Sequence, residues 1–209
     1  MNPVETEVKF HVPDLPAVRA KLLSLGARSL GRSQERNIRF ENEAKGLRRV
    51  GNLLRLRQDH KSTLTYKCAP AQADPEFKQF TELEVEVSDF DTMRLILACL
   101  GFHPEQVYEK WRETLILDNT AFCLDELPFG NFLEIEGPKE HIRDFAGRLA
   151  LEWGRRILLN YLEIFEIIRA DQGLPFRDAT FANFIGRTLD PTPFLPRMEA
   201  GRPARQPSL

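Results

Sequence analysis

The stretch Val4-Glu-Thr-Glu-Val-Lys-Phe10 decides the fold, because its charged and apolar residues alternate without a break. On a β-strand this alternation places Glu5, Glu7 and Lys9 on one face and the apolar residues on the other, where a core can pack. Two carboxylates beside an ammonium group can hold a divalent cation and the phosphate that accompanies it. A single strand of this kind more often has a solvated charged face, so the interpretation depends on whether the arrangement recurs.

The arrangement does recur along the chain, on strand after strand. Seven further strands are expected, at about residues 34–41, 53–57, 63–67, 81–87, 106–117, 121–127 and 132–136, mostly joined by hairpin turns. The cations on their charged faces, with that of the first strand, are Lys9, Arg55, Arg57, Lys67, Lys110 and Arg112. The acids are Glu5, Glu7, Glu82, Glu84, Glu86, Asp125, Glu134 and Glu136. Helices are expected between Pro13 and Gly26, from an N-cap at Asp91 to Gly101, and at about 139–152 and 156–169.

An eight-stranded antiparallel sheet can curl closed, with its charged face inward and its apolar face outward under the helices. We therefore expect an α+β fold: a closed eight-stranded antiparallel β-barrel with a polar tunnel and helices packed outside. Burying so many charges in a dry interior costs several kcal/mol per ion. The tunnel must therefore hold water, and its charges must pair with each other, with a metal or with a ligand.

The mixture of charges indicates the class of ligand. Several arginines and lysines suit a polyphosphate, because guanidinium groups bind phosphate oxygens bidentately and lysines act as point charges. Clusters of carboxylate oxygens suit Mg²⁺ or Mn²⁺, which bridge phosphates and neutralise developing charge. An interior with both kinds of residue is typical of a triphosphate site.

The opening Glu5-x-Glu7-x-Lys9 resembles the signature of the CYTH superfamily, named for class IV adenylyl cyclase and thiamine triphosphatase and also called the triphosphate tunnel metalloenzymes. Later segments resemble the family's strand motifs in order. They are Leu54-Arg-Leu-Arg57, the strand of Lys67, the alternating glutamates at 82–86, Lys110-x-Arg112, Asp125 and Phe132-Leu-Glu-Ile-Glu136, followed by a helix motif at Tyr161-Leu-Glu-Ile164. The resemblance covers about residues 3–168.

The resemblance implies that the basic residues grip a triphosphate while the acidic residues hold Mg²⁺ or Mn²⁺. The phosphate-binding residues implied are Lys9, Arg55, Arg57, Lys67, Lys110 and Arg112. The metal-side residues implied are Glu5, Glu7, Asp125, Glu134 and Glu136, together with Glu82, Glu84 and Glu86, of which the family usually needs only two. Lys9, Glu7 and Arg57 are expected to act in catalysis. One departure is Arg39-Phe40-Glu41, where relatives commonly have an aromatic pair followed by Asp.

Three functions remain open from the sequence. The leading hypothesis is a metal-dependent hydrolase of inorganic triphosphate or of a nucleoside or thiamine triphosphate, in which water attacks the terminal phosphoryl group. The first alternative is class IV adenylyl cyclase, in which the ribose hydroxyl of ATP attacks the α-phosphate and pyrophosphate leaves. The second alternative is a noncatalytic polyphosphate-binding module. Hydrolase and cyclase differ in whether an adenine pocket exists, which the residues do not reveal.

The composition fits a globular protein with a sizeable core, since 42% of the 209 residues are hydrophobic. The formal net charge of −2 gives no overall field that would attract nucleic acid or a membrane surface. Cys68, Cys99 and Cys123 lack paired-ligand spacing, which favours buried thiols in a reducing compartment. With no leader and no long apolar segment, we expect a cytoplasmic monomer or homodimer that acts on a small-molecule triphosphate, without nucleic-acid or membrane partners.

We expect one tunnel domain at residues 1–170 and a C-terminal extension at 171–209. Five prolines fall between Pro191 and Pro207, and the last dozen residues are small or basic. The first part of the extension is expected to dock through Phe176, Phe181, Phe184 and Ile185, and its end to be disordered. Among other residues, the four histidines are expected to have no site role and Trp111 to pack in the core. Lys45, Arg48 and Arg49 are expected to lie in a solvated loop, with the mouth of the tunnel as the alternative.

Overall fold

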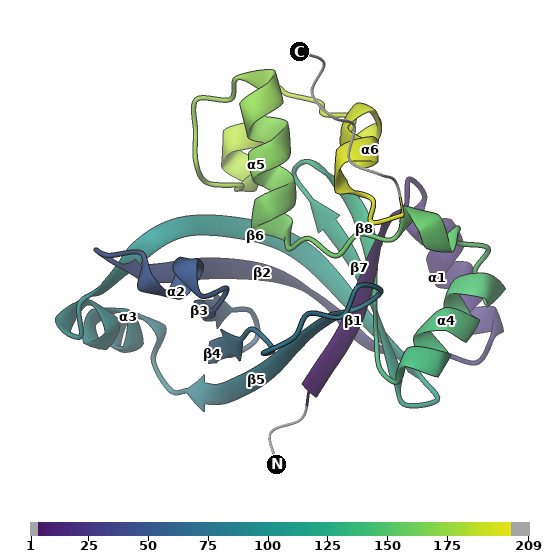
Figure 1. Ribbon diagram of the computed structural model, residues 1–209, viewed down its shortest axis with the longest axis horizontal. Coiled ribbons are helices and arrows are strands. Elements are labelled where there is room, and N and C mark those ends of the chain that lie inside the picture. The colour runs from purple at the N-terminus through teal and green to yellow at the C-terminus, as the bar shows by residue number, and fades with distance from the viewer. Residues whose placement is uncertain (1–3, 202–209) are drawn as a thin grey trace.

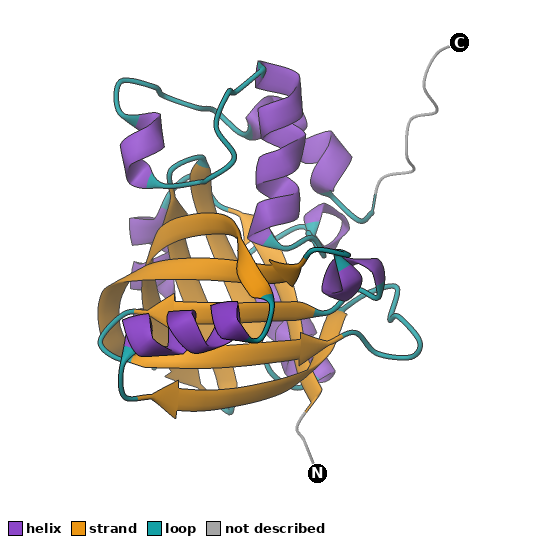
Figure 2. Ribbon diagram, turned by 90° about the vertical axis from the view of Figure 1, so that its left-hand side faces the viewer, coloured by secondary structure: helices purple, strands orange, loops and turns teal. Residues whose placement is uncertain are grey.

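Eight strands form one closed antiparallel barrel in the computed structural model, which describes residues 4–201. The ring order is β1-β5-β4-β3-β2-β6-β7-β8, and the strands curve around a common interior in Figure 2. The strands are β1 (Val4–His11), β2 (Arg28–Asn42), β3 (Leu53–Gln58), β4 (Ser62–Cys68), β5 (Lys78–Val87), β6 (Phe102–Leu117), β7 (Thr120–Leu127) and β8 (Gly130–Glu136). The expected fold class is confirmed.

Helices cover the outside of this barrel. They are α1 (Leu15–Ser24), α2 (Gly46–Arg49), α3 (Phe90–Cys99), α4 (Lys139–Arg148), α5 (Tyr161–Gln172) and α6 (Leu195–Met198), with 3₁₀ turns η1 (Trp153–Arg155), η2 (Phe181–Phe184) and η3 (Thr192–Phe194). In Figure 1, α1 and α4 lie on one side of the barrel, α3 lies on the opposite side, and α5 stands above it. Among the helices that the structure describes, none combines the length and the apolar character that a membrane crossing requires.

The alternation in β1 buries both of its faces. Val8 and Phe10 point outward into an apolar cluster with Leu22 of α1 and Phe145 of α4. Lys9, between them in sequence, points inward and is 1% exposed. A strand in this position needs apolar side chains on its outer face and mutually paired charges on its inner face, which is the pattern that the sequence shows.

Two helix starts are fixed by side-chain caps. The Asp14 carboxylate accepts a hydrogen bond from the Ala17 amide at 2.9 Å, as expected for the helix that begins there. The start of α3 was predicted wrongly. Asp89 is its cap, accepting from the Thr92 amide at 2.6 Å, and Asp91 lies inside the first turn. Both aspartates precede the apolar run, so the sequence pattern alone did not distinguish them.

The two helices predicted after β8 are shorter than expected. The first ends at Arg148 instead of 152, because the chain reverses at Ala150, whose φ is +60°. The second begins at Tyr161 instead of 156, because Ile157 exchanges backbone hydrogen bonds with Lys9. An Asn160 cap then starts α5, with Glu163 completing a reciprocal capping box.

The strands β2 and β6 are longer than predicted. They pair from Arg28 and Ile116 at one end to Asn42 and Phe102 at the other, with two register shifts. One shift lies beside Pro104, which a bulged strand tolerates because a bulge leaves a backbone donor unpaired anyway. The basic connection before β3 also contains a helix, α2, which the sequence analysis did not predict.

The segment after α5 docks on the domain, although not through every expected residue. Phe176 and Phe184 pack against Phe165 of α5, and Ala179 forms a parallel bridge with Tyr108 of β6. Ile185 is 81% exposed and takes no part. The expectation for residues 202–209 lies outside the described residues, and the division of the chain at residue 170 stays a prediction.

Candidate functional site

The barrel encloses a cavity of about 1120 Å³. Every predicted site residue lines it except Glu86 and Asp125. Side chains from the start of α5, including Tyr161 and Glu163, complete the lining, and so do Lys45 and Arg48 beside α2. The structure therefore brings charged residues that are distant in sequence into one shared interior.

The charges of this interior are sorted by strand. Three neighbouring strands, β8, β1 and β5, carry what we call the acidic wall: Glu5, Glu7, Glu82, Glu84, Glu134 and Glu136. The three strands on the other side of the ring, β3, β2 and β6, carry the basic wall: Arg39, Arg55, Arg57, Lys110 and Arg112. Strands β4 and β7 separate the two walls. A ligand in the cavity therefore has cations on one side and carboxylates on the other.

Asp125 holds part of the basic wall in place. Its carboxylate accepts hydrogen bonds from Lys110 at 3.1 Å, from the Arg112 Nε at 2.6 Å and from the Tyr161 hydroxyl at 2.6 Å. Asp125 is fully buried and does not reach the cavity. This placement differs from the expected metal-side position. Its oxygens are used by fixed donors, because α5 brings Tyr161 over the inner face of β7.

Arg55 and Arg57 keep unused hydrogen-bonding capacity. Arg55 donates to the Tyr108 hydroxyl at 3.4 Å and to the Thr65 hydroxyl at 3.3 Å, both long contacts. The Nε of each arginine donates no hydrogen bond within the described residues, although Asp59 Oδ2 lies 3.3 Å from that of Arg57. Both side chains line the cavity, so the weakly engaged guanidinium groups can donate to an anion there.

Three lysines cross-link the acidic wall. Lys9 lies 2.5 Å from Glu134 and 3.3 Å from Glu7, and Lys78 lies 2.9 Å from Glu7. Lys67 contacts Glu5 and lies 2.8 Å from Glu82. These ion pairs neutralise most of the wall, which would otherwise be destabilised by desolvation and mutual repulsion.

Glu136 is the exception on the acidic wall. Within residues 4–201 it has no ion pair, and its one polar contact is the Cys123 thiol. Burial and the neighbouring Glu134 raise the pKa of Glu136 to about 7. Glu7 behaves differently: burial favours its neutral form, but Lys78 and Lys9 overcome this effect and lower its pKa to about 2.

A group of three carboxylates fits a divalent cation. Oxygens of Glu5, Glu7 and Glu136 all lie within 4.8 Å of one another. Hard carboxylate oxygens are the ligands that Mg²⁺ and Mn²⁺ prefer, and a cation would offset the repulsion that raises the pKa of Glu136. The residues present therefore fit the metal that the family implies.

The structure separates the three alternating glutamates of β5. Glu82 and Glu84 line the cavity, and Glu84 lies 3.5 Å from Arg57. The Glu86 side chain is 64% exposed and pairs with Lys61, outside the cavity. Glu86 is thus the residue of this set that does not reach the site, which the sequence left undecided.

Several residues of the site were missed. Glu35, 3.5 Å from Lys110, follows the same inward alternation in β2, so that pattern could have revealed it. Lys78 was missed because the strand expected from the sequence begins at residue 81, three residues after the observed start of β5. Arg39 lines the cavity, whereas Glu41 binds the backbone amides of residues 47 and 48 at the start of α2.

Two further expectations need correction. Lys45 and Arg48 line the cavity, which agrees with the alternative given for them and not with the favoured solvated loop, because Glu41 anchors the α2 turn against the barrel. Trp111 does point out of the barrel but lies under the Arg32 guanidinium, 4.7 Å from the ring centre, and belongs to none of the apolar clusters.

Comparisons with known proteins agree with this geometry. A family model described as the CYTH domain matches residues 3–169. A protein of Methanocaldococcus jannaschii, named "Putative adenylate cyclase MJ0240", is 29% identical over 135 residues, which are 64% of this chain and 76% of that protein. The solved PH1012 protein of Pyrococcus horikoshii OT3 is 31% identical, with a TM-score of 0.66 over 76% of this chain and 98% of that chain. HpAC1 from Hippeastrum, described as a "Putative adenylyl cyclase", shares the fold at 18% identity, with a TM-score of 0.58 over 78% of this chain and 94% of that chain.

Proposed function

Because the chain belongs to the CYTH domain family, we propose that it is a metal-dependent hydrolase of triphosphate-containing substrates. The substrate is inorganic triphosphate or a nucleoside or thiamine triphosphate. Water attacks the terminal phosphoryl group, the bond to the bridging oxygen breaks, and the products are orthophosphate and the diphosphate part of the substrate.

The observation that carries this proposal is the facing pair of walls. A triphosphate is a linear polyanion, and the basic wall offers it cations from three adjacent strands. The acidic wall offers carboxylates on the opposite side, where a divalent cation can bind to the same phosphates. A ligand that carries phosphates and a divalent cation together accounts for the presence of both walls.

Phosphate binding is assigned to Lys9, Arg55, Arg57, Lys67, Lys110 and Arg112. The side chains of Arg55 and Arg57 line the cavity, where their guanidinium groups can donate to phosphate oxygens. Asp125 and Tyr161 fix Lys110 and Arg112 before substrate arrives, so little reorganisation is needed on binding. Such preorganised cations stabilise the charge that develops on a transferred phosphoryl group.

Metal binding is assigned to Glu5, Glu7 and Glu136, with Glu82, Glu84 and Glu134 close by on the same wall. When bound there, Mg²⁺ or Mn²⁺ neutralises negative charge on the phosphate oxygens. Glu136 is the carboxylate most in need of a cation, because it has no ion pair among the described residues.

Catalytic roles are assigned to Lys9, Glu7 and Arg57. Lys9 lies between Glu7 and Glu134, and these carboxylates raise its pKa although burial opposes them. Its ammonium group therefore stays charged and places a fixed positive charge against the substrate. Glu7 stays ionised at neutral pH, and Arg57 supplies a donor from the basic wall.

Adenylyl cyclase is the second candidate, because relatives carry that name. The cavity volume of about 1120 Å³ reaches the upper end of the range for small-molecule sites, so a nucleoside beyond the phosphates can be accommodated. HpAC1 from Hippeastrum is nevertheless described as having a dominant triphosphatase activity. We therefore keep hydrolysis as the leading function.

A product-resolved assay tests the proposal. The purified protein is incubated with Mg²⁺ or Mn²⁺ and with tripolyphosphate, ATP or thiamine triphosphate, and the products are separated. Orthophosphate release supports the hydrolase. Pyrophosphate with cyclic AMP supports the cyclase, and binding without turnover supports a polyphosphate-binding module. A cytoplasmic location, a monomeric or homodimeric state and the absence of nucleic-acid or membrane partners stay predictions.

A further inference from the structure

Arg39 is a cation of the cavity that lacks a counter-ion. Its side chain is half-buried and lines the cavity, yet within residues 4–201 it forms no ion pair and no side-chain hydrogen bond. Its register partner on β3 is Arg55, which lines the same cavity. Like charges directly opposite each other on adjacent strands are destabilising, and an anion bound between them removes that cost.

The carboxylates closest to Arg39 along the chain and in the pairing of β2 with β6 are already engaged. Glu41, the next inward residue of β2, accepts hydrogen bonds from two backbone amides in α2, at 3.1 and 2.8 Å. Glu105 is shared by Lys45, at 3.4 Å, and Arg177, at 2.8 Å. One carboxylate therefore serves two other cations before Arg39 is considered.

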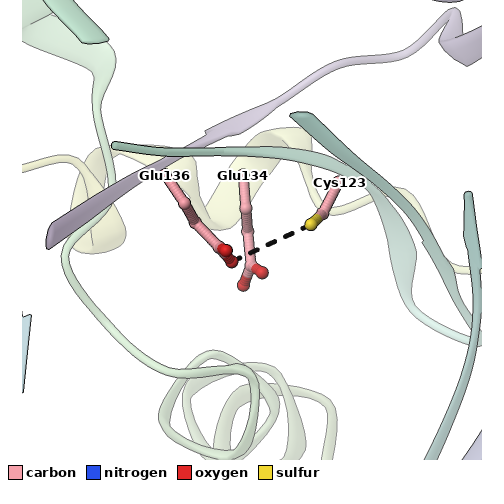
Figure 3. A group of neighbouring side chains, drawn as sticks. All are labelled: Cys123, Glu134 and Glu136. Atoms are coloured by element: carbon pink, nitrogen blue, oxygen red, sulfur yellow. Dashed lines mark hydrogen bonds between the residues drawn. The ribbon is translucent and has the colours of Figure 1, made fainter. Parts of the chain in front are cut away.

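The acidic wall does not neutralise Arg39 either. Glu134 and Glu136, which Figure 3 shows beside the Cys123 thiol, lie on β8, three strands away from β2 in the ring. Glu134 is already paired with two cations of its own. The positive charge of Arg39 is thus directed at the cavity without a partner from the described part of the chain.

Arg48 adds a second cation at the same end of the cavity. α2 packs against β2 and β3 (Figure 1), and the bond from the Arg48 amide to Glu41 places this turn two residues beyond Arg39 on β2. The exposed Arg48 side chain lines the cavity and has no ion pair among the described residues. Four cations therefore gather here and form ion pairs, within residues 4–201, with Glu105 alone: Arg39, Lys45, Arg48 and Arg177.

We propose that Arg39 and Arg48 form a subsite for one phosphate group beyond the three of a triphosphate. The preferred substrate is then a chain of four or more phosphates. Arg55 joins the subsite to the basic wall, because it lies opposite Arg39. Guanidinium groups suit this role, since their planar donors bind phosphate oxygens bidentately. The inference rests on the proposed function, because it takes the triphosphate to lie along the basic wall.

Space and charge both fit a longer substrate. The cavity volume of about 1120 Å³ is at the upper end of the range for small-molecule sites. A fourth phosphate brings additional negative charge, which the two unpaired arginines can balance. An inorganic chain and a nucleoside 5′-tetraphosphate present the same group to this subsite, and the experiment separates these two sources.

The test is titration calorimetry on the full chain with a chelator in place of divalent metal, so that nothing is hydrolysed. The ligands are tripolyphosphate and tetrapolyphosphate, and ATP and adenosine 5′-tetraphosphate. We expect the fourth phosphate to tighten binding about tenfold to a hundredfold, the effect of a charge-assisted contact. A gain with tetrapolyphosphate indicates an inorganic chain. A gain with adenosine 5′-tetraphosphate alone indicates a nucleotide.

Variants locate the gain in the subsite. Arg39→Gln and Arg48→Gln should each reduce the affinity ratio between four and three phosphates, and the double variant should bring it to about one. Arg39→Lys keeps the charge and should retain part of the gain. Arg36→Gln is the matched control, because Arg36 lies on the same strand but is exposed and outside the cavity. Thermal unfolding verifies that each variant is folded.

Equal affinity for three and four phosphates in both ligand pairs would overturn the subsite. So would a preference for four phosphates that persists in the double variant. The proposed function is judged separately, by hydrolysis with Mg²⁺ or Mn²⁺. If the preference is present but no triphosphate is hydrolysed, the subsite stands and the proposed function fails. Hydrolysis without the preference leaves the function and removes the subsite.

Discussion

Arg57 is the side chain whose removal should separate phosphate binding from folding. Its side chain lines the cavity, and its ionic neighbours Asp59 and Glu84 can both be solvated without it. We expect Arg57→Ala to raise the KM for tripolyphosphate about tenfold to a hundredfold, the effect of losing a charge-assisted hydrogen bond. Steady-state kinetics and calorimetric binding provide the measurement. Arg94→Ala on the exterior of α3 is the control, and an unchanged KM in Arg57→Ala contradicts its assignment.

Glu136 should determine the metal requirement. Glu136→Gln keeps the shape of the side chain but removes the charge from the group with Glu5 and Glu7. We expect the Mg²⁺ or Mn²⁺ concentration for half-maximal activity to rise about tenfold. Glu86→Gln is the matched control, because Glu86 lies outside the cavity. If both variants titrate with metal like the unmodified protein, Glu136 is not a ligand.

The pKa of Glu136 also predicts a pH dependence. Because this pKa is raised from 4.5 to about 7, the folded protein binds a proton there that the unfolded chain releases. The contribution of this group to stability is complete below about pH 4.5 and is lost as pH rises through about pH 7. Burial raises the pKa of Glu5 to about 8, which acts in the same direction and extends the loss of stability to about pH 8. The shifts of Glu7 and Glu35, to about 2, act at lower pH.

Metal-free protein should therefore lose stability between about pH 4.5 and about pH 8, and Mg²⁺ should restore it because the ionised carboxylates gain a partner. The apparent metal affinity should rise over the same interval. Urea denaturation with and without metal measures the first effect. Stability that rises with pH in the absence of metal would have the wrong sign.

Among the elements, the segment after α5 is expected to hold that helix over the cavity. Phe184 lies against Phe129, Phe165 and Phe176, with ring centres 5.2 to 6.5 Å apart. We expect Phe184→Ala to lower the free energy of unfolding by about 3 kcal/mol, as for other buried phenylalanines. The exposed neighbour Ile185 provides the control, because Ile185→Ala should change the free energy of unfolding by less than about 0.5 kcal/mol. Equal effects would show that the segment is not integral to the core.

The strands were predictable because the inner face is charged and the outer face apolar, so each reads as a clear two-residue period. Their ends were less so. The start of β5 at Lys78 and the full length of β2 depend on pairing with strands distant in sequence, which local patterns do not contain. Helix ends failed for a similar reason, since Ile157 extends along β1 instead of starting a helix.

At the scale of the whole molecule, inward alternation identified the cavity-lining charges, but not their order around the ring. The pairing of β1 with both β5 and β8 is nonlocal, and it is this pairing that collects the carboxylates into one wall. The placement of Asp125 could not be predicted either, because it depends on the Tyr161 hydroxyl, delivered by a helix 36 residues later. The type of a side chain and its two-residue period predict which face of a strand it lies on. Tertiary packing determines which other residue it contacts.

The two facing walls are tested most directly by a crystal structure of the protein with tripolyphosphate and Mn²⁺. The phosphates should lie inside the barrel against Arg55, Arg57 and Lys110, and the anomalous signal of manganese should lie beside Glu5, Glu7 and Glu136. Tripolyphosphate bound only on the outer surface, with the barrel interior filled by water alone, would contradict a triphosphate site in this cavity.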